Sequence, residues 1–225
     1  DGKILEENAD FNLLASKERI DRILEKADIY GCDNGNVRGL IFCSSIIESK
    51  ALSDGFNSRG LKTIALSGAD NDTHRTNAIL RLETNELQYI FTVDIFNEGI
   101  DIPTVNQIIM LRPTQSAIVF VQQLGRGLRK IDDKDYLTVI DFIGNYKNNF
   151  LVPIALYGDT TYNKDSLRKL MASGSSLIPG TSTINFDEIS RAKIFEAIDA
   201  ANMQLKRDLV KDYLLNIPGH ISILS

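Results

Sequence analysis

Five short apolar runs alternate with helix-length segments between residues 37 and 142, and this alternation limits the possible folds most strongly. The runs span residues 39–43, 61–66, 88–93, 107–111 and 136–140. Nearly continuous apolarity over about five residues is typical of strands that are buried on both faces, and such strands occur in parallel sheets. The pattern therefore predicts an α/β domain with helices on both faces of a central parallel sheet.

Helical patterns separate most of these runs and also flank them. Ser45 and Glu48 have the spacing of a capping box, in which Ser caps a helix and Glu reaches back. Gly31 is expected to end the first helix. Apolar spacing near 3.6 predicts helices over residues 8–30, 72–83 and 116–129, and a long helix or a helix pair over 187–215. We expect three parts, namely an N-terminal helix over 1–36, the α/β domain over 37–158 and a helical extension over 159–225.

Composition excludes several classes of protein. The 225 residues are 43% hydrophobic and 24% charged, which excludes a largely disordered chain. No apolar stretch reaches the ~18 residues of a membrane span. Two cysteines and two histidines are too few for a disulfide framework or a zinc cage, so we expect free thiols and a cytoplasmic protein. The start at Asp1 has neither Met nor a signal core, so the chain is expected to be a piece of a longer one.

Two arginines lie three residues apart at the end of an apolar helical segment. Arg126 and Arg129 would share one helix face, where two guanidinium groups can hold a phosphate from two directions. The alternative is a solvated basic helix end that complements the helix dipole. Gly125 and Gly127 flank Arg126, and Gly costs ~1 kcal/mol in a helix interior. These glycines therefore suggest that another backbone or a ligand lies close to this part of the helix.

Residues 91–103 directly follow a predicted buried strand, at the edge where open α/β sheets bind ligands. Gly99 can let the backbone approach a nucleotide, and the Asp101 carboxylate can accept hydrogen bonds from ribose hydroxyls. The alternative is an ordinary turn that contains an ordinary acid.

The order of these segments carries a family resemblance. Residues 39–45 (GLIFCSS) resemble helicase motif IV, residues 91–103 resemble motif V, and residues 122–129 (QQLGRGLR) resemble motif VI. Together they resemble the C-terminal RecA-like lobe of superfamily 2 helicases. The surrounding residues are similar to those of bacterial restriction- or repair-type DNA helicases, including some fused to a nuclease module. Gln123 stands where DEAD-box relatives have Arg, which argues against an RNA-unwinding DEAD-box identity.

The resemblance implies roles for individual residues in an ATP-driven motor. Arg126 and Arg129 would reach ATP held by an N-terminal lobe that is absent from this chain, and Gln122 would line the same cleft. Gly99, Asp101 and Gly125 would contact the nucleotide. The expected contacts to a nucleic-acid backbone, DNA rather than RNA, are Ser44, Ser45, Ser67, Gly68 and Thr92.

The parts that would bind the phosphate chain and Mg²⁺ are not recognised in this sequence. Residues 55–63 come nearest to a phosphate-binding loop, but they have one residue too many and precede a strand instead of following one. We therefore expect ATP and Mg²⁺ in the parent protein and no metal or cofactor bound by this chain alone. Two alternatives stay open. One is a non-catalytic nucleic-acid-binding or docking module; the other is a Rossmann-type enzyme, which the Ser44–Ser45 pair after the first strand disfavours.

Overall fold

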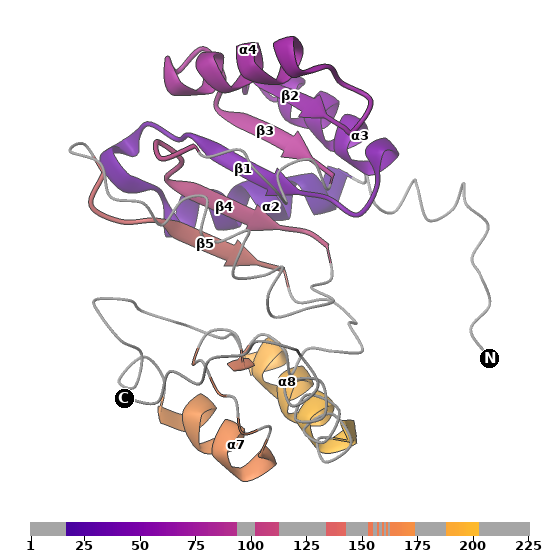
Figure 1. The fold of residues 1–225 in the computed structure, drawn as a ribbon, viewed down its shortest axis with the longest axis vertical. Coiled ribbons are helices and arrows are strands. Elements are labelled where there is room, and N and C mark those ends of the chain that lie inside the picture. Colours follow the sequence, from indigo (N-terminus) through magenta and orange to yellow (C-terminus); the bar gives the residue numbers. More distant parts are fainter. Residues whose placement is uncertain are drawn as a thin grey trace, which may run out of the picture. The chain divides into compact units, whose positions relative to one another are not determined.

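Five parallel strands form one sheet in the order β2-β3-β1-β4-β5, and all five arrows point the same way in Figure 1. The neighbouring strands start level with one another, since Gly39 of β1 lies beside Tyr89 of β3 and Gln107 of β4. The five predicted strands and their parallel pairing are confirmed. Their bounds are Gly39–Phe42 (β1), Thr63–Leu66 (β2), Tyr89–Thr92 (β3), Gln107–Met110 (β4) and Thr138–Asp141 (β5).

This computed structural model describes residues 17–93, 102–112, 134–142, 153–154, 157, 159, 161, 163–173 and 188–202. The chain divides into two units, one of residues 1–113 and 121–143 and one of residues 114–120 and 144–225. The first unit contains the whole sheet. The bounds of the three parts expected from the sequence, at 36/37 and 158/159, stay a prediction.

The core of the first unit lies between the sheet and two helices, α2 (Lys17–Tyr30) and α3 (Ile46–Asn57). Ile41, Phe91 and Ile109 point from the central strands into this cluster, where Phe56 of α3 meets the Phe91 ring edge to face. Alternate residues of the same strands face the other way and are equally buried: Leu40, Phe42, Ile90, Ile108 and Met110. Burial on both faces explains why these strands are apolar runs.

The helix α4 (Asp72–Glu83) has the bounds that the sequence pattern predicts. The chain moves in opposite directions along the sheet from β1 to β2 and from β2 to β3. Right-handed crossovers therefore place α3 and α4 on opposite faces. The predicted N-terminal helix is confirmed over its described part, and it ends at Gly31, whose φ of 61° favours glycine. The helix expected over residues 116–129 lies outside the described residues.

The second unit contributes two described helices, α7 (Lys164–Ser173) and α8 (Glu188–Ala200). Leu167 and Ile194 are fully buried. Arg168 of α7 forms an ion pair with Asp199 of α8, and Lys164 Nζ donates to the Asp199 carbonyl oxygen at 2.6 Å. Of the long helix or helix pair expected over residues 187–215, α8 is the described part, and residues 203–215 lie outside the described residues. The sequence pattern did not predict α7, although Asn163 caps it through the Asp165 and Ser166 amides.

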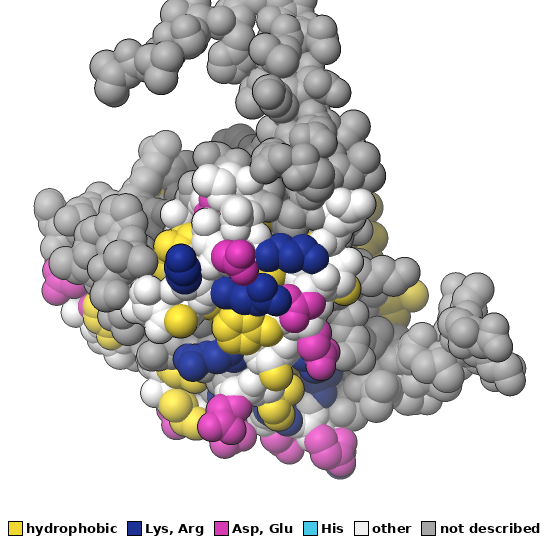
Figure 2. All heavy atoms as spheres, turned by 90° about the horizontal axis from the view of Figure 1, so that it is seen from below, with side chains coloured by type: hydrophobic (Ala, Val, Ile, Leu, Met, Phe, Trp, Pro, Cys, Tyr) yellow, Lys and Arg dark blue, Asp and Glu magenta, His cyan; other side chains and the backbone are white. Residues whose placement is uncertain are grey.

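Charges of both signs lie interleaved with apolar side chains on the face shown in Figure 2. The chain as a whole carries a net charge of -5. Among the described helices, none is long and apolar enough to cross a membrane.

Candidate functional site

The parallel sheet brings several predicted contact residues to one edge. Because all strands run the same way, their ends at Phe42, Leu66, Thr92, Met110 and Asp141 form a single edge, which we call the carboxyl edge. The sheet order makes β2, β3 and β1 neighbours. The structure therefore places all five predicted nucleic-acid contacts on three adjacent strand ends: Ser44 and Ser45 after β1, Ser67 and Gly68 after β2, and Thr92 at the end of β3.

The loop from β1 into α3 is fixed by its own helix cap. Ser45 is the N-cap residue, and its Oγ accepts a hydrogen bond from Glu48 N at 3.1 Å. Glu48 Oε2 in turn accepts from Ser44 N at 2.6 Å. The predicted capping spacing is confirmed, but the carboxylate reaches Ser44, one residue further upstream than the N-cap amide. Ser44 itself is exposed at the carboxyl edge.

The charge of Glu48 is compensated although its side chain is 1% exposed. Arg19 Nη2, from α2, donates to Glu48 Oε1 at 2.7 Å, so the two carboxylate oxygens hold two different elements. Burial raises the pKa of the neighbouring Cys43 thiol well above its ordinary value, and Glu48 acts in the same direction. Cys43 is therefore a neutral core residue and not a nucleophile.

The loop from β2 into α4 is held from inside by Asp70 and Arg75. Asp70 Oδ2 accepts from Ser67 N at 2.7 Å, and Arg75 Nη2 donates to the Gly68 carbonyl oxygen at 2.9 Å. His74 Nδ1 lies 2.8 Å from Asp70 Oδ1. Burial alone would raise the pKa of Asp70, but hydrogen bonds from Ser67 and His74 outweigh it and lower the pKa. A stable carboxylate thus fixes this turn.

These bonds leave the Gly68 backbone as the accessible part of the turn. Ser67 is 7% exposed, and its Oγ bonds to Asp70 Oδ2 at 3.1 Å. A Cβ built on Gly68 would meet no atom within 4 Å, and no described residue accepts from the Gly68 amide. Gly68 is thus an exposed residue with open space at its Cα, while the Ser67 side chain serves the turn.

Thr92 ends β3 with a side chain that is 0% exposed. Its Oγ1 has no hydrogen-bond partner within the described part of the chain. In the sheet register Thr92 lies between Leu66 of β2 and Phe42 of β1. A buried hydroxyl without a partner is costly, so it is an unusual feature of this edge.

Arg112 belongs to the same edge, and the sequence pattern did not predict its place there. It follows β4 after one intervening residue, and its Cζ lies 5.8 Å from the centre of the Phe42 ring. Its place could have been predicted from one feature of the sequence. Arg112 comes just after a predicted buried strand, at the edge that already holds the serines.

The remaining predicted residues are Gln122, Gly125, Arg126, Arg129, Gly99 and Asp101, and they lie outside the described residues. Gly99 and Asp101 follow β3 in sequence, and the other four fall between β4 and β5. In the ranges that the structure does describe, no three His, Cys, Asp or Glu side chains are grouped to hold a metal ion.

Comparison with known proteins identifies relatives of this architecture. The family model described as "Helicase conserved C-terminal domain" matches residues 17–130. IRC3 of Saccharomyces cerevisiae is 26% identical over 212 residues, which cover 92% of this chain and 30% of IRC3. SrmB of Haemophilus influenzae is 28% identical over 92 residues, or 41% of this chain and 21% of SrmB. The chain thus spans less than a third of the length of these relatives.

A solved structure shares the fold. The yeast DEAD-box splicing factor Prp28 superimposes with a TM-score of 0.56 at 17% identity, over 80% of this chain and 34% of Prp28. The parallel sheet with helices on both faces is thus a RecA-like architecture, as the sequence pattern predicts. Because the family model covers half of the residues and includes the entire described carboxyl edge up to Arg112, the chain belongs to the helicase conserved C-terminal domain family and is a C-terminal lobe of a superfamily 2 helicase.

Proposed function

We propose that this chain is the second motor lobe of an ATP-dependent DNA helicase or translocase. One observation carries the proposal: five candidate backbone contacts lie on three adjacent strand ends, at the edge from which the motif V segment continues. Membership in the helicase family supports the motor role in this proposal. One relative, SrmB, is by name an ATP-dependent RNA helicase, so both DNA and RNA are tested below.

Arg126 and Arg129 would act on the γ-phosphate of ATP bound to an N-terminal lobe of the same polypeptide. In phosphoryl transfer a protein mainly positions groups and neutralises developing charge, and one supplied arginine contributes ~10³–10⁵ in rate. Gln122 would line the cleft, and Gly99, Asp101 and Gly125 would contact the nucleotide. ATP and Mg²⁺ would be held mainly by the other lobe, because no phosphate-binding loop is recognised in this sequence.

The nucleic-acid strand would run along the carboxyl edge over β1, β3 and β2. Ser44 and Gly68 are both exposed and are suited to phosphate oxygens, and such contacts carry no sequence information. A narrow track of this kind needs no large basic surface, which agrees with the net charge of -5. Closing and opening of the two lobes would move this track along the strand.

The preference for DNA rests on Gln123 and is tested directly by offering both nucleic acids. Membership in a bacterial restriction- or repair-type group, a fused nuclease module and a cytoplasmic location stay predictions of the sequence.

Arginine substitutions in the full-length protein test the motor role. Arg126→Ala and Arg129→Ala should each lower DNA-stimulated ATP hydrolysis by about 10³-fold or more, since each removes a charge that stabilises the transition state. Phosphate release with single-stranded DNA and with RNA of equal length measures the rate, and binding of a fluorescent ATP analogue shows that the nucleotide still binds.

Arg81→Ala supplies the matched control, because Arg81 is 40% exposed on α4 and pairs with Glu86 at 3.5 Å, away from the carboxyl edge. Unchanged hydrolysis in both arginine variants would remove Arg126 and Arg129 from the mechanism. A wild-type protein that binds DNA but never hydrolyses ATP would instead support the non-catalytic binding module.

A further inference from the structure

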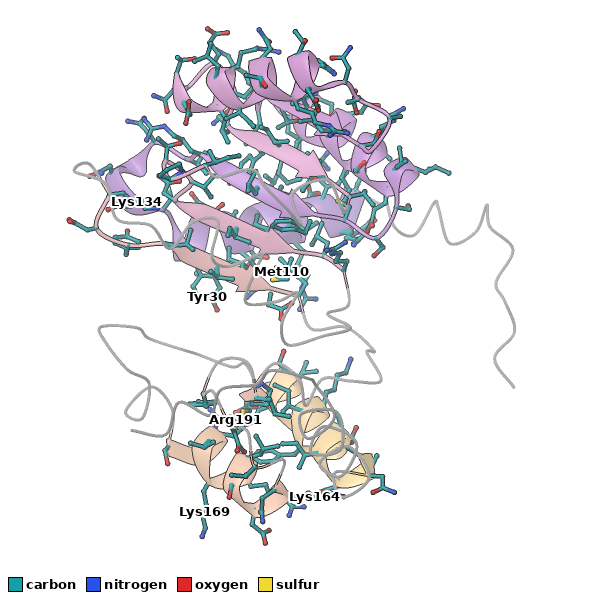
Figure 3. All side chains as sticks on the ribbon, in the orientation of Figure 1. Tyr30, Met110, Lys134, Lys164, Lys169 and Arg191 are labelled. Carbon is teal, nitrogen blue, oxygen red and sulfur yellow. The ribbon has the colours of Figure 1, made fainter. Side chains whose placement is uncertain are left out.

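Lys134 is a buried lysine to which the proposed function gives no role. It lies four residues before β5, and Figure 3 shows it at the opposite end of the sheet from Met110. Only 8% of the residue is exposed. Burial of an ammonium group is costly unless the group donates hydrogen bonds, so the bonding partners of Lys134 indicate what it does in the fold.

The ammonium group of Lys134 binds the backbone of the segment that leads into β4. Its Nζ donates to the Pro103 carbonyl oxygen at 2.6 Å and to the Val105 carbonyl oxygen at 3.1 Å. Hydrogen bonds from a charged donor are roughly twice as strong as neutral ones. Lys134 therefore fixes the segment before β4 to the segment before β5.

The turn Asp33–Gly35, which follows α2, holds the same two segments at points nearer to the strands. Asp33 Oδ2 accepts from Asp135 N at 2.6 Å. Asn106 Nδ2 donates to the Asp33 carbonyl oxygen at 2.9 Å. These bonds anchor residues 106 and 135, whereas the bonds of Lys134 join residue 134 directly to residues 103 and 105. Lys134 thus supplies the link that lies closest to the preceding motifs.

The two segments that Lys134 joins are the ends of motifs V and VI. Pro103 is the last residue of the motif V segment, and Asp101 precedes it by two residues. Arg129, at the end of the motif VI segment, precedes Lys134 by five residues. An extended chain spans at most ~3.6 Å per residue, so these distances along the chain are short. The bonds of Lys134 therefore restrict how far the two motifs can move relative to one another.

We propose that Lys134 is a positioning residue for ATP hydrolysis, which holds the motif VI arginines in a fixed arrangement relative to motif V. The inference rests on the proposed function and gives Lys134 itself no contact with ATP or nucleic acid. A misplacement of about 1 Å can lower a reaction rate ~10²-fold, so loss of this link should appear in kcat.

A double-mutant cycle in the full-length protein, with DNA-stimulated ATP hydrolysis as the readout, tests this role. Lys134→Met keeps a long unbranched side chain without donors, and it should lower kcat on the order of 10²-fold. The same substitution is then made in a protein that carries Arg126→Ala and Arg129→Ala. There it should lower kcat less than about 2-fold, because arginines that are absent cannot be misplaced.

Three control variants separate positioning from folding. Lys134→Arg keeps donors for both carbonyl groups and should restore most of the wild-type kcat. Gln107→Leu removes buried bonds to α2 and to Tyr89 at the same end of the sheet, and it should leave kcat unchanged at temperatures where the protein is folded. Lys62→Met makes the same chemical change at an exposed lysine just before β2 and should also leave kcat unchanged.

Several outcomes would overturn the proposal. A Lys134→Met protein with wild-type kcat removes Lys134 from the mechanism and leaves the arginines in it. An equal fold-loss with and without the two arginines assigns Lys134 a purely structural role. If Lys134→Met does not fold, Lys134→Gln, whose shorter side chain keeps an amide donor, replaces it in the cycle and is judged by the same two outcomes. Unchanged hydrolysis in the protein that lacks both arginines contradicts the proposed function itself.

Discussion

Asp141 ends β5 with a carboxyl group whose surroundings favour its neutral form. Burial raises its pKa from 3.8 to about 7. No described residue forms an ion pair or a hydrogen bond with it. Among the acids that the structure describes, Asp141 is the one for which ionisation opposes folding most clearly, because the unfolded chain solvates the carboxylate and the folded chain does not.

The sign of the pH effect follows from the raised pKa. The contribution of Asp141 to stability is fully present below pH 3.8 and is lost as the pH rises through about 7. Asp141→Asn should remove this loss, so the variant should gain on the order of 3 kcal/mol over the wild type between pH 5 and pH 8. Urea unfolding of both proteins at the two pH values measures the difference.

Asp54→Asn serves as the control, since Asp54 is exposed on α3. A wild-type and an Asp141→Asn protein whose unfolding free energies change in parallel with pH would contradict the role given to this carboxyl.

Spacing in the sequence predicted some residue roles and missed others. The Ser45–Glu48 cap follows from local spacing, because helix geometry alone brings those groups together. The position of the Glu48 carboxylate at Ser44 N does not follow from that spacing, since the same carboxylate also binds Arg19 from another helix. Arg112 and Arg75 were missed for the same reason: their partners, the Phe42 ring and the Gly68 carbonyl, are set by the tertiary path of the chain.

Among the elements, α2 is attached to the sheet at both its apolar face and its end. Ile20 and Ile23 enter the core. Gln107 Nε2 donates to the carbonyl oxygens of Ala27 at 3.1 Å and Gly31 at 2.8 Å, where the helix ends. A helix terminus leaves carbonyl groups unpaired, so a buried amide from β4 satisfies them.

Gln107→Leu should therefore loosen α2 more than its loss of size suggests. The Gly31 carbonyl would lose its partner, and so would the Tyr89 hydroxyl, which donates to Gln107 Oε1 at 2.7 Å. Two such groups cost about 2–4 kcal/mol together. Urea unfolding measures the loss, and hydrogen exchange should show faster exchange in α2 than in α3.

Gln88→Leu is the matched control. Its Oε1 accepts a single exposed bond, from Lys62 N at 3.0 Å, so the loss should stay below about 1 kcal/mol. Equal losses for the two glutamines would contradict the special role of Gln107.

The sequence predicted those elements whose buried residues form a regular pattern along the chain. Each central strand is buried on both faces, so its apolar run is visible without any tertiary knowledge. The helix α7 was not predicted, because only Leu167 and Met171 of its ten residues are buried and its apolar pattern is therefore weak. The strand order could not be predicted, because each crossover can lead to either side of the sheet and only packing decides between them.

At the scale of the whole molecule, the proposed function makes this chain one lobe of a two-lobe motor. It lacks a sequence that would cradle a phosphate chain, and it spans 30% of the length of IRC3. Purified residues 1–225 should therefore show no ATP hydrolysis above background, with or without DNA. A phosphate-release assay measures this, and robust turnover by these residues alone would contradict the two-lobe interpretation.

The carboxylate of Glu48 connects two separate elements of the first unit. One of its oxygens accepts from Arg19 at 2.7 Å and the other from the Ser44 amide at 2.6 Å, so one carboxylate of α3 joins α2 to the loop that leaves β1. The carboxylate is buried, so water does not readily replace either partner. Glu48 therefore fixes the position of α2 relative to the loop that carries Ser44, at the edge proposed to bind the strand.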